Sequence, residues 1–272
     1  MSKLLKYNKY MLKFVIGIDL HGTLLDNEWE IKSDLLIPLD KALEGVRGFC
    51  KVYVCSGNDL TFIHKFIPKE IYRHFDGYVL ETGCVISEGK NEDVIVPSPL
   101  IEVIRDLEYK LKKKNFPWVQ YFARRKSTIS LFTRTESEGE PPDAVFPEVK
   151  AIVKQLGFGE DVRVTHSNVA VDIIPRGFDK FRGLGHVASG RPTIGIADSM
   201  NDIELVRDAD LAFIPANASL KLIRELAKKG KSVLDLGDTL PKDKEIVWRS
   251  RFSSTRGVLE ILGFIEDVIK GY

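Results

Sequence analysis

Polar side chains suited to binding phosphate and divalent cations are concentrated in four short segments of the sequence. Three of these segments directly follow the apolar runs at residues 14–18, 51–55 and 193–196, and the fourth surrounds a lysine. Together they supply carboxylates, hydroxyls, amides, an imidazole and an ammonium group: Asp19, His21, Thr23, Ser56, Asn58, Asp59, Lys180, Asp198, Asn201 and Asp202. Carboxylates hold Mg²⁺ through one or two direct contacts and leave its other positions to water and phosphate oxygens, which lysine and hydroxyl groups also bind. These residue types favour a site for a magnesium-bound phosphate.

The apolar runs before these segments have the pattern of buried parallel strands. The run FVIGI at residues 14–18 is continuously apolar and partly β-branched, which is typical of a strand buried on both faces. Further strands are predicted at residues 51–55, 77–80, 193–196 and 211–214, with helices at 33–49, 60–75, 180–189, 202–207 and 255–270. Alternating strands and helices imply a parallel sheet, in which ligands bind beyond the carboxyl ends of the strands. We therefore expect the polar segments to meet at one edge of an α/β sheet.

A different pattern from residue 85 to residue 175 predicts a second domain inserted into the first. It contains predicted helices at residues 99–114 and 147–156, and predicted strands at 119–124, 128–133, 162–165 and 169–174. A helix followed by two alternating strands, repeated once, describes a small α+β domain with an open antiparallel sheet. The core domain then comprises residues 1–84 and 176–272, and Tyr121 and Phe132 of the insertion are expected to pack in its hydrophobic core.

The composition restricts the class of protein and its partners. With 44% hydrophobic and 29% charged residues, the chain has the composition of a folded globular protein. Its 40 basic and 39 acidic residues give a net charge of +1, which argues against a nucleic-acid partner. The three cysteines form no CxxC pair and the apolar run near the start is too short to span a bilayer, so we expect a cytoplasmic protein without membrane association. The oligomeric state is left open.

Four motifs, in this order, resemble those of the haloacid dehalogenase (HAD) superfamily. They are DLHGT at residues 19–23, a strand that ends at Ser56, the lysine Lys180, and GIADSMND at residues 195–202. The insertion between the second and third motifs resembles the cap of subfamily IIB. The segment SNVAVDIIPRGFDK at residues 167–180 is similar to the one before the conserved lysine in phosphomannomutase and related sugar-phosphate phosphatases. The resemblance covers essentially the whole chain and implies a Rossmann-like parallel-sheet core with an inserted C2-type cap.

The resemblance also implies a role for each motif residue. Asp19 would be the nucleophile that attacks phosphorus and becomes an aspartyl phosphate. Mg²⁺ would be held by the carboxylates of Asp19 and Asp198, by Asp202 through water, and by the backbone carbonyl of His21. The phosphoryl group would be bound by Ser56, Gly57, Lys180 and Asn201.

Position 21 departs from the superfamily pattern. Most of its phosphatases have an aspartate two residues after the nucleophile, where it protonates the leaving group and then activates water, whereas this chain has His21. A histidine can do both because its ordinary pKa of about 6.5 lies near neutral pH, but an imidazolium beside Mg²⁺ is disfavoured. Three interpretations stay open: His21 is the acid and base, it marks a weakened or lost activity, or it is a local structural substitute. A smaller departure is Ala197, where glycine is usual.

The insertion is expected to recognise the substrate, because caps of this type close over the site and exclude water. Arg124, Arg134, His166 and Asn168 lie at or near the ends of predicted strands and offer hydrogen-bond donors for sugar hydroxyls or a second anionic group. The resemblance therefore favours an Mg²⁺-dependent phosphatase of a small phosphorylated metabolite, in particular a sugar phosphate. Two alternatives are a sugar phosphomutase and a phosphometabolite-binding protein in which His21 has ended turnover.

Overall fold

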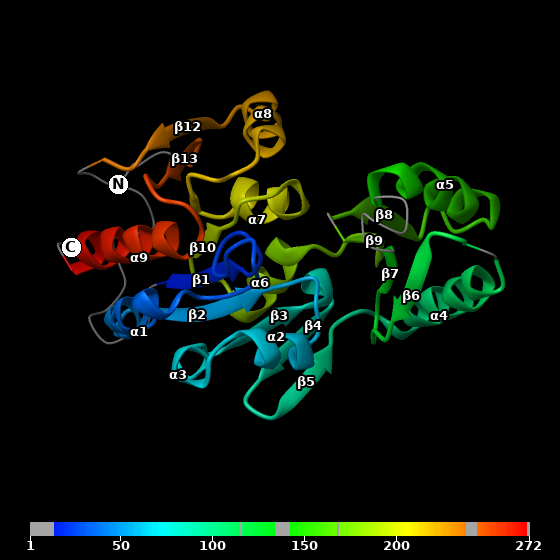
Figure 1. Ribbon diagram of the computed structural model, residues 1–272, viewed down its shortest axis with the longest axis horizontal. Helices are drawn as coiled ribbons and strands as arrows, with labels where there is room; N and C mark the ends of the chain where they lie inside the picture. The colour runs from blue at the N-terminus through cyan, green and yellow to red at the C-terminus, as the bar shows by residue number, and fades with distance from the viewer. Residues whose placement is uncertain (1–13, 115, 134–141, 168, 238–243, 271–272) are drawn as a thin grey trace. The chain divides into compact units, whose positions relative to one another are not determined.

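The computed structural model describes residues 14–114, 116–133, 142–167, 169–237 and 244–270 (Figure 1). These residues form two compact units. The first unit runs to Gly83, includes Ser87–Asn91 and resumes at Asp179, and the second comprises Cys84–Ile86 and Glu92–Phe178. The domain boundaries predicted from the sequence, after residues 84 and 175, differ from this division by a few residues, since Ser87–Asn91 belong to the first unit and the second unit continues to Phe178.

A nine-stranded sheet forms the centre of the first unit, in the order β12-β13-β11-β10-β1-β2-β3-β4-β5. Its strands are β1 (Phe14–Asp19), β2 (Cys50–Cys55), β3 (Gly77–Leu80), β4 (Val85–Glu88), β5 (Asn91–Val94), β10 (Thr193–Ile196), β11 (Leu211–Ile214), β12 (Ser232–Asp235) and β13 (Ile246–Arg249). The pairs from β12 through β3 are all parallel. The central strands β1 and β10 are almost entirely buried, as the continuous apolar runs predict for strands covered on both faces.

Helices cover this sheet and fix the positions of its strands. They are α1 (Ser33–Arg47), α2 (Leu60–Phe66), α3 (Lys69–Tyr72), α6 (Lys180–Ala188), α7 (Ile203–Asp208), α8 (Leu220–Lys228) and α9 (Ser254–Lys270), with 3-10 turns at Glu81–Gly83 and Met200–Asp202. Helix α1 lies beside α9, and α6 packs on β1, β2, β3 and β10 (Figure 1). The approach of α6 is close, since a Cβ at Gly17 of β1 would lie 2.8 Å from Leu184 Cδ2 and 2.9 Å from Cys55 Sγ.

Three predictions of helices and strands were wrong or incomplete. The single helix expected at residues 60–75 is two short helices, because Pro68 has no N–H to donate and holds Ile67 in an extended conformation. The helix expected to start at Pro147 starts at Pro142 and contains Pro147. Helix α8 and the strands β12 and β13 were not predicted at all.

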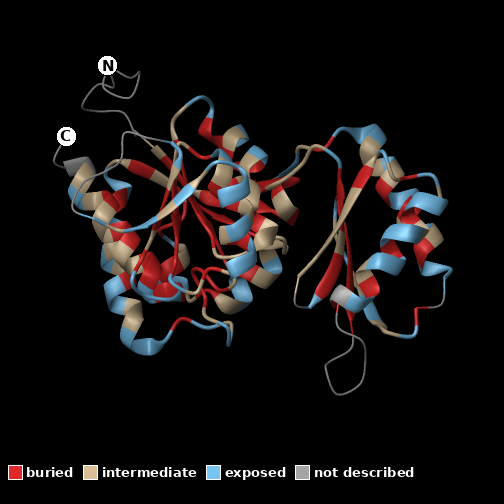
Figure 2. Ribbon diagram, turned by 90° about the horizontal axis from the view of Figure 1, so that it is seen from above, coloured by how far each residue is buried: buried red, intermediate tan, exposed pale blue. Residues whose placement is uncertain are grey.

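The second unit is a four-stranded antiparallel sheet with two helices packed on one face. It contains α4 (Ser98–Lys112), β6 (Val119–Ala123), β7 (Ile129–Thr133), α5 (Pro142–Gln155), β8 (Val162–His166) and β9 (Ala170–Pro175), with the strand order β6-β7-β9-β8. Its core joins apolar residues of α4 and α5 to alternate residues of the strands, such as Ile129, Leu131 and Val171. Figure 2 shows the buried residues on the inner sides of the helices and along the strands. This is the α+β insertion that the sequence predicts.

None of the helices in the described ranges has the length and apolar character needed to cross a membrane.

Candidate active site

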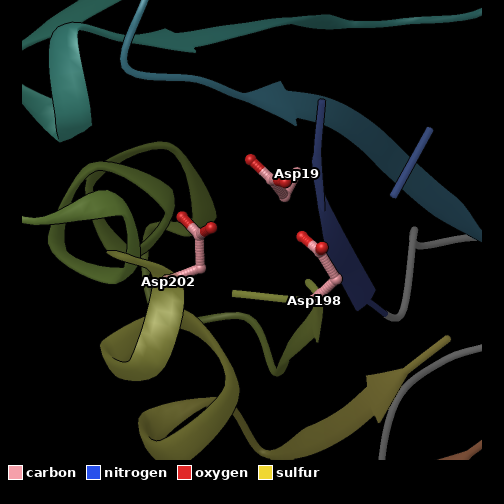
Figure 3. A group of neighbouring side chains, drawn as sticks. All are labelled: Asp19, Asp198 and Asp202. Atoms are coloured by element: carbon pink, nitrogen blue, oxygen red, sulfur yellow. The ribbon is translucent and has the colours of Figure 1, made fainter. Parts of the chain in front are cut away.

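Three carboxylates meet at the carboxyl ends of β1 and β10 (Figure 3). Asp19 is the last residue of β1, Asp198 follows β10, and Asp202 lies in the next 3-10 turn. One oxygen of each lies within 4.8 Å of the others. Asp19 and Asp202 are only 4% and 2% exposed, so the group is buried and not a solvated acidic patch. The structure thus brings together the three aspartates that the resemblance assigned to the metal.

Lys180 lies against two of these carboxylates. Its Nζ is 2.6 Å from Asp19 Oδ1 and also forms an ion pair with Asp202. The lysine is 6% exposed and is the first residue of α6, where the carboxylate of Asp179 caps the helix by accepting a hydrogen bond from Arg182 N at 2.8 Å. Burial alone would lower the pKa of Lys180, but the neighbouring carboxylates outweigh it and raise the pKa above its ordinary value. The ammonium group is therefore charged, as phosphate binding requires.

The start of α6 is held in place by two glycines. Gly83 has φ +89°, and a Cβ there would lie 1.9 Å from the carbonyl oxygen of Asp179. A Cβ at Gly183 would lie 2.5 Å from Val79 Cγ1 and 2.8 Å from Gly83 Cα. The helix therefore rests directly on the backbone of the turn at Glu81–Gly83, which places Lys180 next to Asp19.

The buried charges of this group are unbalanced. Burial and the charges of Asp19 and Asp202 raise the pKa of Asp198 to about 8, against a weaker lowering by the hydroxyl of Thr23 and by Lys180. Burial and the charge of Asp19 likewise raise the pKa of Asp202 to about 6, although Lys180 and Ser199 lower it. The single positive charge of Lys180 therefore does not balance the negative charge of three carboxylates. A divalent cation would supply the missing positive charge, and hard carboxylate oxygens are the ligands that Mg²⁺ prefers. The donor set therefore fits the implied metal.

His21 lies in an aromatic environment. Its ring centroid is 4.9 Å from that of Trp29 and 5.2 Å from that of Phe62. Burial, followed by the charge of Lys180, lowers the pKa of His21 to about 4, against a smaller opposing effect of Asp202. Its Nε2 is buried and, among the residues that the structure describes, has no hydrogen-bond partner. At neutral pH the side chain is a neutral imidazole with one ring nitrogen available to a ligand.

The predicted phosphate-binding residues other than Lys180 occupy two loops at the same end of the sheet. Ser56 follows β2 and is 1% exposed, and its Oγ accepts a hydrogen bond from Asn58 N at 3.1 Å. Gly57 lies next to it, where a Cβ would touch Thr82 Oγ1 at 3.4 Å. Asn201 is partly exposed in the turn that carries Asp202. Each therefore lies in a loop that follows the carboxyl end of a strand, as expected.

The four predicted cap residues have different surroundings. Arg124 is exposed directly after β6, while Arg134 and Asn168 lie outside the described residues. His166 pairs with Val171 in the sheet and contacts the ring of Phe146 in α5 at 5.0 Å, which places it on the side that carries the helices. A role of these residues in substrate recognition stays a prediction.

The opposite face of the cap sheet carries residues that the sequence did not assign to substrate recognition. Tyr121 stacks on Phe132 with a centroid distance of 4.8 Å and an interplanar angle of 6°, and Ser130 Oγ donates a hydrogen bond to Asp172 Oδ1 at 2.6 Å. Tyr121 is 49% exposed, so the expectation that it packs in the core was wrong. The strand alternation that puts Leu131 in the core turns Phe132 and Ser130 to the other face.

Three further side chains hold the loop after β1 and the carboxylate of Asp198 in place. Thr23 Oγ1 donates to Asp198 Oδ1 at 3.2 Å, and Asn217 Nδ2 donates to the carbonyl of Gly22 at 2.7 Å. Thr255 Oγ1 donates to the carbonyl of Leu24 at 2.8 Å. Thr23 was among the candidates named from the sequence, whereas Asn217 and Thr255 were missed because nothing in the sequence links them to the loop after β1.

The fold and the site together define a class. A parallel α/β sheet, three aspartates and a lysine at the carboxyl ends of its strands, and an α+β unit inserted after β3 form the haloacid dehalogenase fold with a cap. This confirms the fold that the sequence predicts.

Comparisons with known proteins agree with this class. No protein-family model and no curated protein matches the sequence. Among solved structures, sucrose-phosphatase from Synechocystis, in complex with sucrose and phosphate, is 19% identical, with a TM-score of 0.66 over 94% of this chain and 99% of that one. A haloacid dehalogenase-like hydrolase from Bacteroides thetaiotaomicron is 15% identical, with a TM-score of 0.62 over 94% of this chain and 100% of that one. The C-terminal domain of trehalose-6-phosphate phosphatase from C. albicans is 16% identical, with a TM-score of 0.58 over 94% of this chain and 93% of that one.

Proposed function

We propose that this chain is an Mg²⁺-dependent phosphatase that hydrolyses a small phosphorylated metabolite through an aspartyl phosphate on Asp19. The observation that carries the proposal is the contact of Lys180 with Asp19 beside Asp198 and Asp202. This arrangement combines a carboxylate nucleophile, carboxylate ligands for a cation and an ammonium group for the phosphoryl oxygens.

In the first step, a carboxylate oxygen of Asp19 attacks phosphorus and the bond from phosphorus to the leaving oxygen breaks. Lys180 and Ser56 hold the phosphoryl oxygens during this displacement. The leaving alkoxide takes its proton from a water molecule. In the second step, water attacks phosphorus and loses a proton to solvent, the bond between phosphorus and Asp19 breaks, and phosphate is released. A bound Mg²⁺, held by Asp19, Asp198, Asp202 and the carbonyl of His21, would reduce the repulsion between the nucleophile and the phosphate.

We further propose that the substrate is a sugar phosphate. Two proteins of the same fold act on sucrose phosphate and trehalose 6-phosphate, as their names state. On the face of the cap sheet opposite its helices, the exposed Tyr121 stacks on Phe132, and Ser130 and Asp172 are joined by a hydrogen bond. Such a mixture of apolar surface and a few polar groups is typical of small-molecule sites.

The experiment that tests this function measures phosphate release from a panel of sugar phosphates and from para-nitrophenyl phosphate, with and without Mg²⁺. The nucleophile variant Asp19→Asn is expected to lose turnover and to keep its fold by circular dichroism. Glu28→Gln, which changes an exposed carboxylate in the loop after β1, serves as the matched control and is expected to keep activity. Turnover that survives Asp19→Asn would refute the mechanism.

One observation favours a second candidate, a protein that binds a phosphorylated metabolite without hydrolysing it. At a pKa of about 4, His21 is uncharged at neutral pH and is a poor proton donor to a leaving group. Equilibrium titration of the wild type with the same sugar phosphates separates the two candidates, because tight Mg²⁺-dependent binding without phosphate release would favour the binding protein.

A further inference from the structure

One side chain outside the four motifs connects three loops around the site. Asn217 lies between β11 and α8. Its Nδ2 donates to the carbonyl of Gly22 at 2.7 Å, and its Oδ1 accepts from Ser254 N at 2.7 Å. Because a carbonyl can only accept and an N–H can only donate, the two partners fix the orientation of the amide. Only a side chain with a donor and an acceptor can make both bonds.

The hydrogen bond to Gly22 leads directly to a predicted metal ligand. The carbonyl of Gly22 belongs to the same peptide group as the N–H of Thr23, and Thr23 Oγ1 donates to Asp198 Oδ1 at 3.2 Å. Gly22 has φ +74° and passes so close to Asp198 that a Cβ would lie 2.3 Å from Asp198 Oδ2. A rotation of this peptide would therefore move the hydroxyl of Thr23 and press the backbone against the carboxylate of Asp198.

The segment that carries Asn217 also touches Asp198 from the other side. Ser219 N donates to the carbonyl of Asp198 at 2.8 Å. The second partner of Asn217, Ser254, has φ +47°, a conformation that is uncommon for serine and that needs external support. Asn217 thus joins the loop after β1 to the start of α9, and both are held next to the loop that presents Asp198.

We propose that Asn217 is a positioning residue of the cation site: by fixing the Gly22–Thr23 peptide it orients the carboxylate of Asp198 and the backbone carbonyl of His21 toward a divalent cation. The proposal rests on the function proposed above, and it assigns to Asn217 the role of a hydrogen-bond partner that holds metal ligands. Loss of such partners typically lowers metal affinity by about 10–100-fold.

Two variants distinguish the hydrogen bond to Gly22 from the one with Ser254. Asn217→Ala removes both hydrogen bonds. Asn217→Asp keeps an acceptor for Ser254 N but turns a carboxylate oxygen toward the carbonyl of Gly22, where no donor remains. The added negative charge would by itself favour a cation, so a lower affinity in this variant cannot be a charge effect. The control is Glu225→Gln, which removes an exposed ion pair with Lys228 in α8 and leaves Asn217 and Ser219 intact.

The experiment is calorimetric titration of the whole chain with MgCl₂ alone, followed by the Mg²⁺ dependence of phosphate release. Both Asn217 variants are expected to bind Mg²⁺ at least about tenfold more weakly. Their kcat at saturating Mg²⁺ should return to within a few fold of wild type, whereas Glu225→Gln should leave the Mg²⁺ affinity unchanged. If Asn217→Ala does not fold, Asn217→Asp decides the question.

Wild-type Mg²⁺ affinity in Asn217→Asp would overturn the proposal, and so would a loss of kcat that saturating Mg²⁺ does not restore. The titration uses no substrate, so its result is separate from that of the proposed function. Mg²⁺ binding without phosphate release would refute the phosphatase and leave the role of Asn217 standing. Phosphate release by the wild type, together with an unchanged Mg²⁺ affinity in the Asn217 variants, would support the phosphatase and refute the role of Asn217.

Discussion

Replacing His21 with aspartate should raise the rate at which alkyl phosphates are hydrolysed. With a pKa of about 4, the imidazole of His21 is protonated in only about 0.1% of molecules at pH 7. Its burial against Trp29 and Phe62 is the main cause of this low pKa. The same burial would raise the pKa of an introduced carboxyl group, since desolvation disfavours the charged form of either residue. His21→Asp therefore replaces a scarce proton donor with a more abundant one.

The size of the effect follows from these protonation states. General acid and base catalysis contributes about 10²- to 10⁴-fold to a rate, and almost none of the acid part is available to His21 at pH 7. We expect kcat of His21→Asp to exceed that of the wild type by about 10²-fold. His21→Ala should stay within about threefold of the wild type, because a group that is protonated so rarely contributes little as an acid.

The assay compares two leaving groups at pH 7 and saturating Mg²⁺. Hexose 6-phosphates leave as alkoxides and need a proton, whereas para-nitrophenyl phosphate leaves as a stable phenolate and needs none. The gain of His21→Asp should therefore appear with the hexose phosphates and largely disappear with the aryl phosphate. Equal rates for His21→Asp and His21→Ala on hexose phosphates would refute this reasoning, as would a loss of more than tenfold in His21→Ala.

Two further predictions concern stability. Without Mg²⁺, the melting temperature should fall as the pH rises from 6 to 8.5, because folded Asp198 and Asp202, with pKa values of about 8 and about 6, retain protons that unfolded carboxylates have already lost. Excess Mg²⁺ should remove this dependence in differential scanning fluorimetry, and an unchanged slope would contradict the charge imbalance. Gly17→Ala should cost about 1–3 kcal/mol in urea denaturation, since its Cβ would lie 2.8 Å from Leu184 Cδ2. Gly185→Ala, where an added Cβ would have no neighbour within 4 Å among the described residues, should instead be neutral or stabilising.

The sequence predicts those parts of this protein that depend on local patterns. The strands β1, β2, β3, β10 and β11 were identified because a strand buried on both faces needs a continuous apolar run. Asp19, Asp198 and Lys180 were identified because they follow such strands or begin a helix within recognisable motifs. Asp19 and Asp198 meet because β1 and β10 are neighbouring parallel strands whose carboxyl ends lie together. Lys180 joins them because α6 packs on the turn at Glu81–Gly83.

What the sequence did not predict depends on contacts between distant segments. Asn217 and Gly22 are 195 positions apart, and no local pattern marks an asparagine whose two hydrogen bonds go to backbone groups of other loops. The aromatic surroundings of His21 come from Phe62 in α2 and from Trp29, which adopts φ +66°. Residue type alone gave an ordinary pKa for His21, whereas burial among these rings gives one near 4. Edge strand β12 was missed because it is short and mostly exposed, so it lacks a continuous apolar run.

The contact between Gly83 and Gly183 has a consequence for how this protein can change during evolution. Because both residues are glycines and have no side chain, α6 can lie close to the turn after β3. The position of Lys180 depends on this approach, since Lys180 is the first residue of α6. A single added methyl group at either glycine would move a charged group that neither of them touches. Substitutions at residues 83 and 183 are therefore limited by the need to keep Lys180 in place, although neither glycine has a functional group. In relatives that have another residue at position 83 or 183, we expect the contact between the equivalents of Lys180 and Asp19 to be lost, or the protein to be inactive, or both.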